Sequence, residues 1–249
     1  MTMEAPETLV VTRSADRVVV ELHRPEVRNA INQQMVDELH LVCAELEVAP
    51  RILIITGSDG VFASGADIGE LRERTAADAA AGINTMLFIR VSELPLPVIA
   101  AIDGYALGAG AELTYAADFR IGTHRTTFGN PETGLGIIAA AGALWRLPQL
   151  VGEPLAKEVL LAGRILGAEE SAAVGLLTSV VEPGELLAAA HALADRIAAK
   201  SVAATIQTKA LMREDRGHHP QAELDAQAVL FDSDDKRRRM TEFLERKKR

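Results

Sequence analysis

The stretch from Val98 to Leu113 constrains the fold most, because it joins a strand to a helix through a turn rich in glycine and alanine. Val98–Ile102 is an apolar, β-branched run of strand length, and the small residues between Gly104 and Ala111 let the chain turn sharply into a helix that carries Glu112. Free backbone N–H groups at such a helix start suit an anion or a carbonyl oxygen that gains negative charge. A carboxylate beside them is what acid–base chemistry on a carbonyl compound requires.

Two other interpretations of this stretch stay open. Strand, glycine turn and helix occur in many α/β folds without any chemistry, and the helix dipole alone favours a glutamate in the first turn. A dinucleotide-binding loop of the form Gly-x-Gly-x-x-Gly would need its third glycine where Leu113 stands, so this signal is weak.

The chain before this stretch alternates between strand and helix patterns. Leu9–Thr12 and Val18–Leu22 are short β-rich runs on either side of a polar turn, so they predict a hairpin. Apolar residues recur at three- and four-residue spacing from Ile31 to Leu46, which predicts an amphipathic helix. Ile52–Thr56 has the continuous apolar content of a buried strand. Strand, helix and strand in this order indicate a crossover unit and an α/β fold.

A second turn with exposed backbone N–H groups is predicted after this buried strand. Asp67 has the position of a helix N-cap, and Glu70 three residues later completes the pattern of a capping box. The N–H of Ala66 should therefore lie just before a helix. Ser64 in the same loop lacks the Gly-x-Ser-x-Gly context of a nucleophile, so we interpret it as a loop serine.

Helical patterns dominate the rest of the chain. One helix is expected over residues 76–94, ending at a proline-rich segment. From Ala139 onward the pattern is almost wholly helical, with Ser179–Val181 as a short extended link. We expect one α/β core over residues 1–195, followed by a C-terminal helical region over residues 196–249 that belongs to the same structural unit.

Composition and charge exclude several classes of function. The formal net charge is −9, and although the tail from Lys236 to Arg249 holds eight basic and two acidic residues, the acidic body argues against nucleic-acid binding. The six histidines show no paired spacing that fits a metal site. Cys43 is the only cysteine, and Met1–Glu7 has no leader pattern. We therefore expect a cytoplasmic protein with no internal disulfide and no membrane span.

Several short motifs together resemble the crotonase superfamily, and most closely enoyl-CoA hydratase, across nearly the whole chain. The motifs are His23-Arg24-Pro25 with Asn29-Ala30, Phe62-Ala-Ser-Gly-Ala66-Asp67-Ile68, Pro97-Val-Ile-Ala-Ala-Ile-Asp-Gly104-Tyr-Ala-Leu-Gly108, Glu112-Leu with Asp118, Phe128-Gly-x-Pro131-Glu132, and Arg146-Leu. The resemblance implies a stacked ββα superhelix whose C-terminal helices make trimers, commonly paired into hexamers. It also implies an acyl-CoA thioester as ligand, with coenzyme A as part of the substrate and no separate cofactor.

Carried over residue by residue, the resemblance implies a site built from the two turns described above. The N–H groups of Ala66 and Ala109 would hold the thioester oxygen, and Glu112 and Glu132 would be the two catalytic carboxylates. The resemblance favours Glu112 as the base and Glu132 as the proton donor, while the sequence alone leaves these two roles open. Contacts with CoA would come from Ala66 and Ala109 together with Arg24, Val27, Ser64, Asp67, Ile68 and Gly69.

Three departures from the family pattern bear on acyl specificity. Ala109 stands in a turn that hydratases usually write as three glycines, where only its N–H is needed. Ala139–Trp145 replaces a segment usually written Pro-Gly-Ala-Gly-Gly-Thr-Gln, and we expect it to wall the acyl and water site. Gly69 occupies a place where a lysine near the CoA phosphates is common.

The sequence leaves three functions open. Hydration of a 2-enoyl-CoA is favoured because both glutamates are present. An enoyl-CoA isomerase is the first alternative, since it needs only the carboxylate of Glu132. An acyl-CoA-binding protein without catalysis is the second alternative, motivated by the altered segment Ala139–Trp145.

Overall fold

The computed structural model describes residues 6–246, and the chain divides into two compact units between Ala194 and Asp195. Residues 1–5 and 247–249, which include most of the N-terminal stretch and the end of the basic tail considered above, lie outside the described residues. Within residues 6–246, no helix is long and apolar enough to cross a bilayer. Nor does this range contain a group of three or more histidine, cysteine or acidic side chains placed to hold a metal ion.

A six-stranded sheet in the order β1-β2-β3-β4-β6-β9 forms the centre of the first unit. β1 and β2 form the predicted antiparallel hairpin, and all other neighbouring strands are parallel. Both faces of the central strands are covered, which explains why their sequences are continuously apolar rather than alternating. The strands are β1 (Leu9–Arg13), β2 (Arg17–Leu22), β3 (Ile52–Gly57), β4 (Val98–Ile102), β6 (Phe119–Thr123) and β9 (Ser179–Val181).

A smaller sheet of three strands in the order β5-β7-β8 lies beside the first. It consists of β5 (Tyr105–Leu107), β7 (Thr127–Gly129) and β8 (Leu166–Gly167). The chain passes from β4 in the large sheet to β5 in the small one, and again from β6 to β7, before it turns into helical structure. This succession of two strands and a helix is the stacked ββα arrangement that the resemblance implied, so the predicted fold is confirmed.

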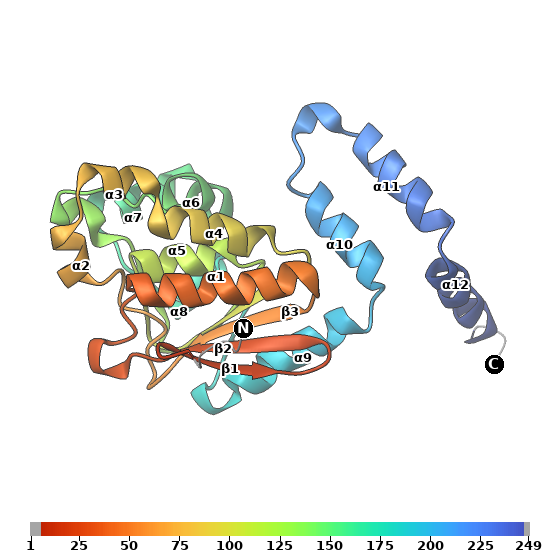
Figure 1. Cartoon of the computed structure of the whole chain (residues 1–249), viewed down its shortest axis with the longest axis horizontal. Coiled ribbons are helices and arrows are strands. Elements are labelled where there is room, and N and C mark those ends of the chain that lie inside the picture. The colour runs from red at the N-terminus through yellow and green to blue at the C-terminus, as the bar shows by residue number, and fades with distance from the viewer. Residues whose placement is uncertain (1–5, 247–249) are drawn as a thin grey trace. The chain divides into compact units, whose positions relative to one another are not determined.

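Helices α1, α4 and α5 cover one face of the large sheet (Figure 1). All eight residues of α5 are buried, so this helix has no polar face, and its small side chains allow close approach to its neighbours. Glu112 is thereby carried into the protein interior. The helices of this unit are α1 (Gln33–Val48), α2 (Ile68–Glu73), α3 (Ala76–Ala81), α4 (Ile83–Glu93), α5 (Ala109–Ala116), α6 (Ala143–Val151), α7 (Glu153–Ala162) and α8 (Ala168–Ala173), and α9 (Leu186–Ala198) runs into the second unit.

The segment around Gly82 differs from its prediction. The single helix expected over residues 76–94 is two helices, α3 and α4, because Gly82 takes a left-handed conformation (φ +64°) that interrupts the helical backbone. Asp67 caps α2 as predicted by accepting from the N–H groups of Gly69 and Glu70. The capping box is incomplete, however, since the Glu70 carboxylate accepts from the N–H of Gln33 at 2.8 Å instead of returning to Asp67.

Ser179–Val181 also differs from its prediction, because it is not a link but the edge strand β9, paired in parallel with β6. Three residues are too few to display a strand period, so the pairing follows from the neighbouring strand and not from the local sequence. The helical pattern expected from Ala139 onward is likewise interrupted by β8, which pairs with β7.

The second unit contains α10 (Val202–Leu211), α11 (Gln221–Phe231) and α12 (Asp234–Arg246). Ser201 caps α10 as predicted, accepting from the N–H of Ala204. Many large apolar side chains of this unit are exposed, which is unusual for helices of a small monomeric unit. They are Val202, Met212, Leu224, Val229, Phe231, Met240, Phe243 and Leu244.

Candidate active site

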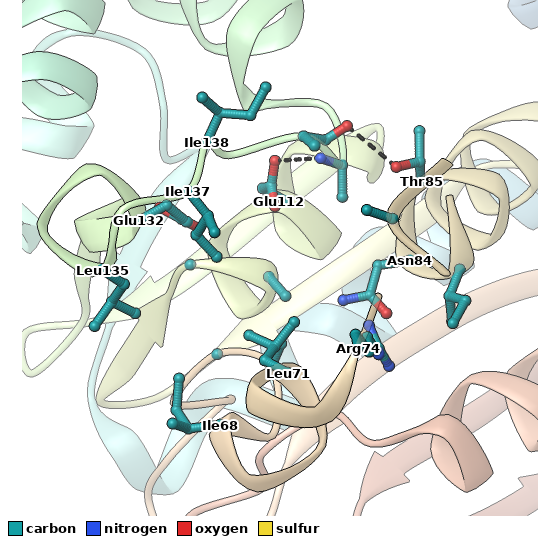
Figure 2. Close-up of a pocket in the computed structure, with 18 of the residues that line it drawn as sticks. Ile68, Leu71, Arg74, Asn84, Thr85, Glu112, Glu132, Leu135, Ile137 and Ile138 are labelled. Atoms are coloured by element: carbon teal, nitrogen blue, oxygen red, sulfur yellow. Dashed lines mark hydrogen bonds between the residues drawn. The ribbon is translucent and has the colours of Figure 1, made fainter. Parts of the chain in front are cut away.

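A cavity of about 710 Å³ opens in the first unit and holds most of the residues predicted for the site. Its walls come from the N-terminus of α5, from the 3₁₀ turn η2 (Pro131–Leu135), from the turn before α6, and from the segment that runs through α2 and α3 into α4 (Figure 2). Apolar side chains dominate the lining. The predicted site residues among the lining are Ser64, Ala66, Ile68, Ala109, Glu112 and Glu132.

The two predicted oxyanion donors are brought together by a close approach of two glycines. Ala63 exchanges backbone hydrogen bonds with Tyr105 and Leu107, each at 3.0 Å, which aligns the two turns. A Cβ on Gly108 would lie 3.7 Å from the Cα of Gly65, and both glycines have positive φ. The residues that follow them, Ala66 and Ala109, therefore lie at the same end of the two turns.

The N–H groups of Ala66 and Ala109 are available as donors. Ala109 is the first residue of α5, so its N–H has no acceptor within the helix. Among the described residues, neither N–H donates to any acceptor, whereas the N–H groups of Gly108 and Asp67 do. Both residues line the cavity, so the free donors suit an oxygen atom of a bound ligand.

Glu112 is held in one orientation by backbone amides. Its side chain is 3% exposed, and Oε1 accepts from the N–H of Ala141 at 2.8 Å and from that of Ala143 at 3.1 Å. Burial raises the pKa of Glu112 to about 7; the two N–H donors oppose this shift, while the nearby Glu132 adds to it. A carboxyl group with such a pKa can gain or lose a proton near neutral pH.

Glu132 is the second carboxyl group of the cavity, in the first turn of η2. It is 8% exposed, and its Oε2 is buried without a hydrogen-bond partner among the described residues. The Asn130 side-chain amide approaches the other oxygen at 3.5 Å. Burial raises the pKa of Glu132 as well, although its own N–H and Asn130 oppose this shift. An unpartnered buried oxygen favours a protonated group or a bound ligand at this position.

The residues predicted to bind CoA fall into two sets. The loops that contain them lie side by side, because the Ser64 N–H donates to Arg28 O and the Ile31 N–H donates to Gly65 O. Ser64, Ala66, Ile68 and Ala109 line the cavity, whereas Arg24, Val27, Asp67 and Gly69 do not. The Arg24 guanidinium donates to Asp67 at 3.1 Å and to Ala30 O at 2.7 Å, so it holds the two loops together.

Several residues of this site were not predicted from the sequence. Asn130 accepts from the Tyr115 hydroxyl and donates toward Glu132, yet it occupies the variable position of the motif Phe128-Gly-x-Pro-Glu. Thr85 and Asn84 line the cavity from α4, in a segment that shows only a helical pattern. The expectation that the segment Ala139–Trp145 walls the cavity agrees with the structure for Ala140 and Ala141.

Known proteins match both the sequence and the fold. Residues 13–249 match the model of the enoyl-CoA hydratase/isomerase family. The chain belongs to this family. A crotonyl-CoA hydratase of Syntrophomonas wolfei is 35% identical over 98% of this chain and 97% of its own length. A short-chain-enoyl-CoA hydratase of Clostridium acetobutylicum is 34% identical over 96% of this chain and 95% of its own length.

Solved structures of the enoyl-CoA hydratase/isomerase family support the same assignment. The crystal structure of an enoyl-CoA hydratase from Bacillus anthracis superposes with a TM-score of 0.91 and 30% identity, covering 96% of this chain and 97% of the other. The family and the hydro-lyase enzyme class predicted from the sequence are thereby confirmed.

Proposed function

We propose that this enzyme adds water across the double bond of a 2-enoyl-CoA to give a 3-hydroxyacyl-CoA. The observation that carries this proposal is the pair Glu112 and Glu132, two buried carboxyl groups in one cavity that also exposes two unused backbone N–H donors. Hydration needs one group that takes a proton from water and one that gives a proton to carbon. The relatives named as hydratases support the same reaction.

The thioester carbonyl oxygen is proposed to accept from the N–H groups of Ala66 and Ala109. As water attacks the β-carbon, negative charge accumulates on this oxygen, and donors already aimed at it stabilise the transition state more than the ground state. Each such donor contributes on the order of 10²–10³ in rate in well-studied cases.

The two carboxyl groups are proposed to divide the proton transfers between them. Burial raises the pKa of Glu112 to about 7, and the two N–H donors on its Oε1 keep this pKa lower than burial alone would, so its ionised form is present near neutral pH. This ionised Glu112 takes a proton from water as the oxygen of that water bonds to the β-carbon. Glu132 has an unpartnered Oε2 that suits a protonated carboxyl group, so it delivers its proton to the α-carbon. Water thus supplies the hydroxyl group of the product and a proton to Glu112, and Glu132 supplies the proton on the α-carbon. Exchange with solvent then removes the proton from Glu112 and reprotonates Glu132, which restores the enzyme for the next turnover. Hydration changes no net oxidation state and needs no external oxidant or reductant, and we propose no cofactor beyond the CoA of the substrate.

Contacts with CoA are proposed for the loop of Arg24 and Val27 and for the loop from Ser64 to Gly69. Ser64 and Ile68 line the cavity, and Val27 is exposed beside Ser64, whose hydroxyl donates to Val27 O at 3.3 Å. Arg24 and Asp67 contribute by keeping the two loops adjacent. Gly69 lies in the first turn of α2, where its N–H donates to Asp67 Oδ1 at 3.0 Å.

The test is conversion of a short 2-enoyl-CoA to the 3-hydroxyacyl-CoA, measured with the wild type and with Glu112→Gln and Glu132→Gln. Each variant is expected to reduce turnover about 10²–10⁴-fold while leaving binding of the CoA ester largely intact. Glutamine keeps the size of the side chain and one acceptor oxygen, so the two variants remove mainly the proton transfer.

Other outcomes would support the two alternative functions instead. Double-bond migration without hydration, lost in Glu132→Gln and retained in Glu112→Gln, would indicate an isomerase. Tight binding of CoA esters over a panel of chain lengths without any turnover would indicate a binding protein.

The quaternary structure and the cellular location are also proposals. We propose a trimer or a pair of trimers assembled through the second unit, since the exposed apolar side chains of α11 and α12 exceed what a soluble monomer would expose.

We propose the cytoplasm as the compartment. Cys43 is free and buried, and burial raises the pKa of its thiol to about 12, so it resists oxidation and does not bear on catalysis.

A further inference from the structure

The peptide unit between Ala140 and Ala141 is hydrogen-bonded at both of its polar atoms. Its C=O accepts from the Thr85 hydroxyl at 3.1 Å, and its N–H donates to Glu112 Oε1 at 2.8 Å. Figure 2 shows these bonds at the upper end of the cavity, with Thr85 and Glu112 on opposite sides of the turn. One amide plane therefore connects α4, α5 and the turn before α6.

Because a peptide unit is planar, its C=O and N–H groups turn together. Because C=O and N–H lie in one plane, any rotation of the unit that moves the carbonyl away from Thr85 also moves the N–H away from Glu112. A hydrogen bond accepted by the carbonyl also polarises the amide and strengthens its N–H as a donor. The Thr85 hydroxyl thus acts on the Glu112 carboxylate without touching it.

The turn that carries this peptide has little regular structure to fix it. Residues 139–142 read Ala-Ala-Ala-Gly, and Gly142 has a positive φ of +136° and offers no side chain to cap α6. Alanine side chains cannot hydrogen-bond to the backbone of the turn. Thr85 supplies a side-chain hydrogen bond to the carbonyl in the middle of this turn.

We propose that Thr85 is a positioning residue for the hydration reaction: it holds the Ala140–Ala141 peptide in the orientation in which its N–H stabilises ionised Glu112. This inference rests on the proposed function, in which Glu112 is the base. Thr85 also lines the cavity, so an acyl chain bound there would exclude water that competes for its hydroxyl. The effect of Thr85 should therefore be larger in the enzyme–substrate complex than in the free enzyme.

Besides the Ala141 and Ala143 N–H groups, charged and titratable side chains on the neighbouring elements could change the pKa of Glu112. Glu132 faces it from η2, and Tyr115 lies one turn away on α5 with a pKa raised by burial and by both carboxylates. On α4, Arg90 is bound to Glu47. From α6, the positive charge of Arg146 contributes to lowering the pKa of the buried Arg120 guanidinium. Arg74 and Asp78 line the cavity from the segment of α2 and α3. The Thr85 hydroxyl donates to Ala140 O and to none of these groups.

The experiment compares Thr85→Val, which removes the hydroxyl at similar size, with Thr85→Ser, which keeps it. Thr12→Val, at an exposed position of β1, is the control for the substitution itself. Hydration of a short 2-enoyl-CoA is measured as kcat and KM across the pH range around the Glu112 pKa of about 7. Thermal midpoints are recorded for every variant.

For Thr85→Val we expect kcat near neutral pH to fall by up to about tenfold with little change in KM, since a hydrogen bond between two neutral groups, the Thr85 hydroxyl and the Ala140 carbonyl, is lost. The acidic limb of the kcat profile should move to higher pH, because a weaker Ala141 N–H donor to the ionised carboxylate raises the pKa of Glu112. Thr85→Ser should restore both, and Thr12→Val should match the wild type. In a Glu112→Gln background, Thr85→Val should add no further loss, since both changes act through the same carboxylate.

A Thr85→Val enzyme with the wild-type acidic limb would overturn the inference, whatever its thermal midpoint, and so would a Thr85→Ser enzyme that behaves like the valine variant. Should the valine variant not fold, Thr85→Ala removes the hydroxyl without adding bulk and gives the same comparison. The proposed function fails separately, if the wild type does not hydrate the substrate or if Glu112→Gln keeps full activity.

Discussion

Replacing Ala109 by proline removes one backbone donor from the cavity and changes little else. Ala109 is the first residue of α5, and its N–H has no acceptor among the described residues, so the helix loses no hydrogen bond. Proline is well tolerated at the first helical position. The preceding residue is Gly108, which has no Cβ to clash with the proline ring.

The expected cost to folding is small, and the expected cost to turnover is large. With no hydrogen bond lost, Ala109→Pro should destabilise the protein by about 1 kcal/mol, which corresponds to a few degrees in thermal midpoint for a chain of this size. The proline ring would occupy the space in front of the former N–H, where the thioester oxygen is proposed to bind. Turnover should therefore fall by at least about 10²-fold.

The assay is hydration of a short 2-enoyl-CoA by wild type, Ala109→Pro and Ala109→Gly, each with a thermal melt. Glycine keeps the N–H and removes only the methyl group, so Ala109→Gly is the matched control and should retain most of the activity. A proline variant that folds and hydrates its substrate at the wild-type rate would refute the role of the Ala109 N–H, and with it the proposed oxyanion hole.

Three further predictions concern the carboxyl pair and the assembly. The folded-state pKa of Glu112 is raised from 4.5 to about 7, so the stability gained by its protonated form is present below about pH 4.5 and lost as the pH rises through 7. Glu112→Gln should therefore raise the thermal midpoint relative to the wild type at alkaline pH more than near pH 5. Gly108→Ala should lower both turnover and stability, the latter by about 1 kcal/mol or more, because Gly108 has φ +50° and a Cβ there would lie 3.0 Å from Glu132 Oε1. Unchanged melting and activity would contradict this account of Gly108. Light scattering at micromolar concentration should give a trimer or hexamer, and a monomer would rule out assembly through α11 and α12.

The helix starts of the site could be predicted from the sequence because local residues decide them. The apolar run Val98–Ile102, the glycines around Ala109 and the cap at Asp67 fix a strand, a turn and a helix within a few residues. The family motifs added the identity of the two glutamates. The predicted capping box at Glu70 was wrong because a residue distant in sequence decides it: the Gln33 N–H donates to the Glu70 carboxylate.

The tertiary structure alone decided how the two glutamates are tuned. The sequence placed Glu112 on a helix but could not state that its carboxylate meets the N–H groups of Ala141 and Ala143, or that α4 brings Thr85 to the same turn from 55 residues away. Propensity and periodicity describe neighbours along the chain, whereas burial and hydrogen bonding at the site depend on segments that meet only in the folded protein. A pKa near 7 for Glu112 follows from that burial, because removing water destabilises its charged form.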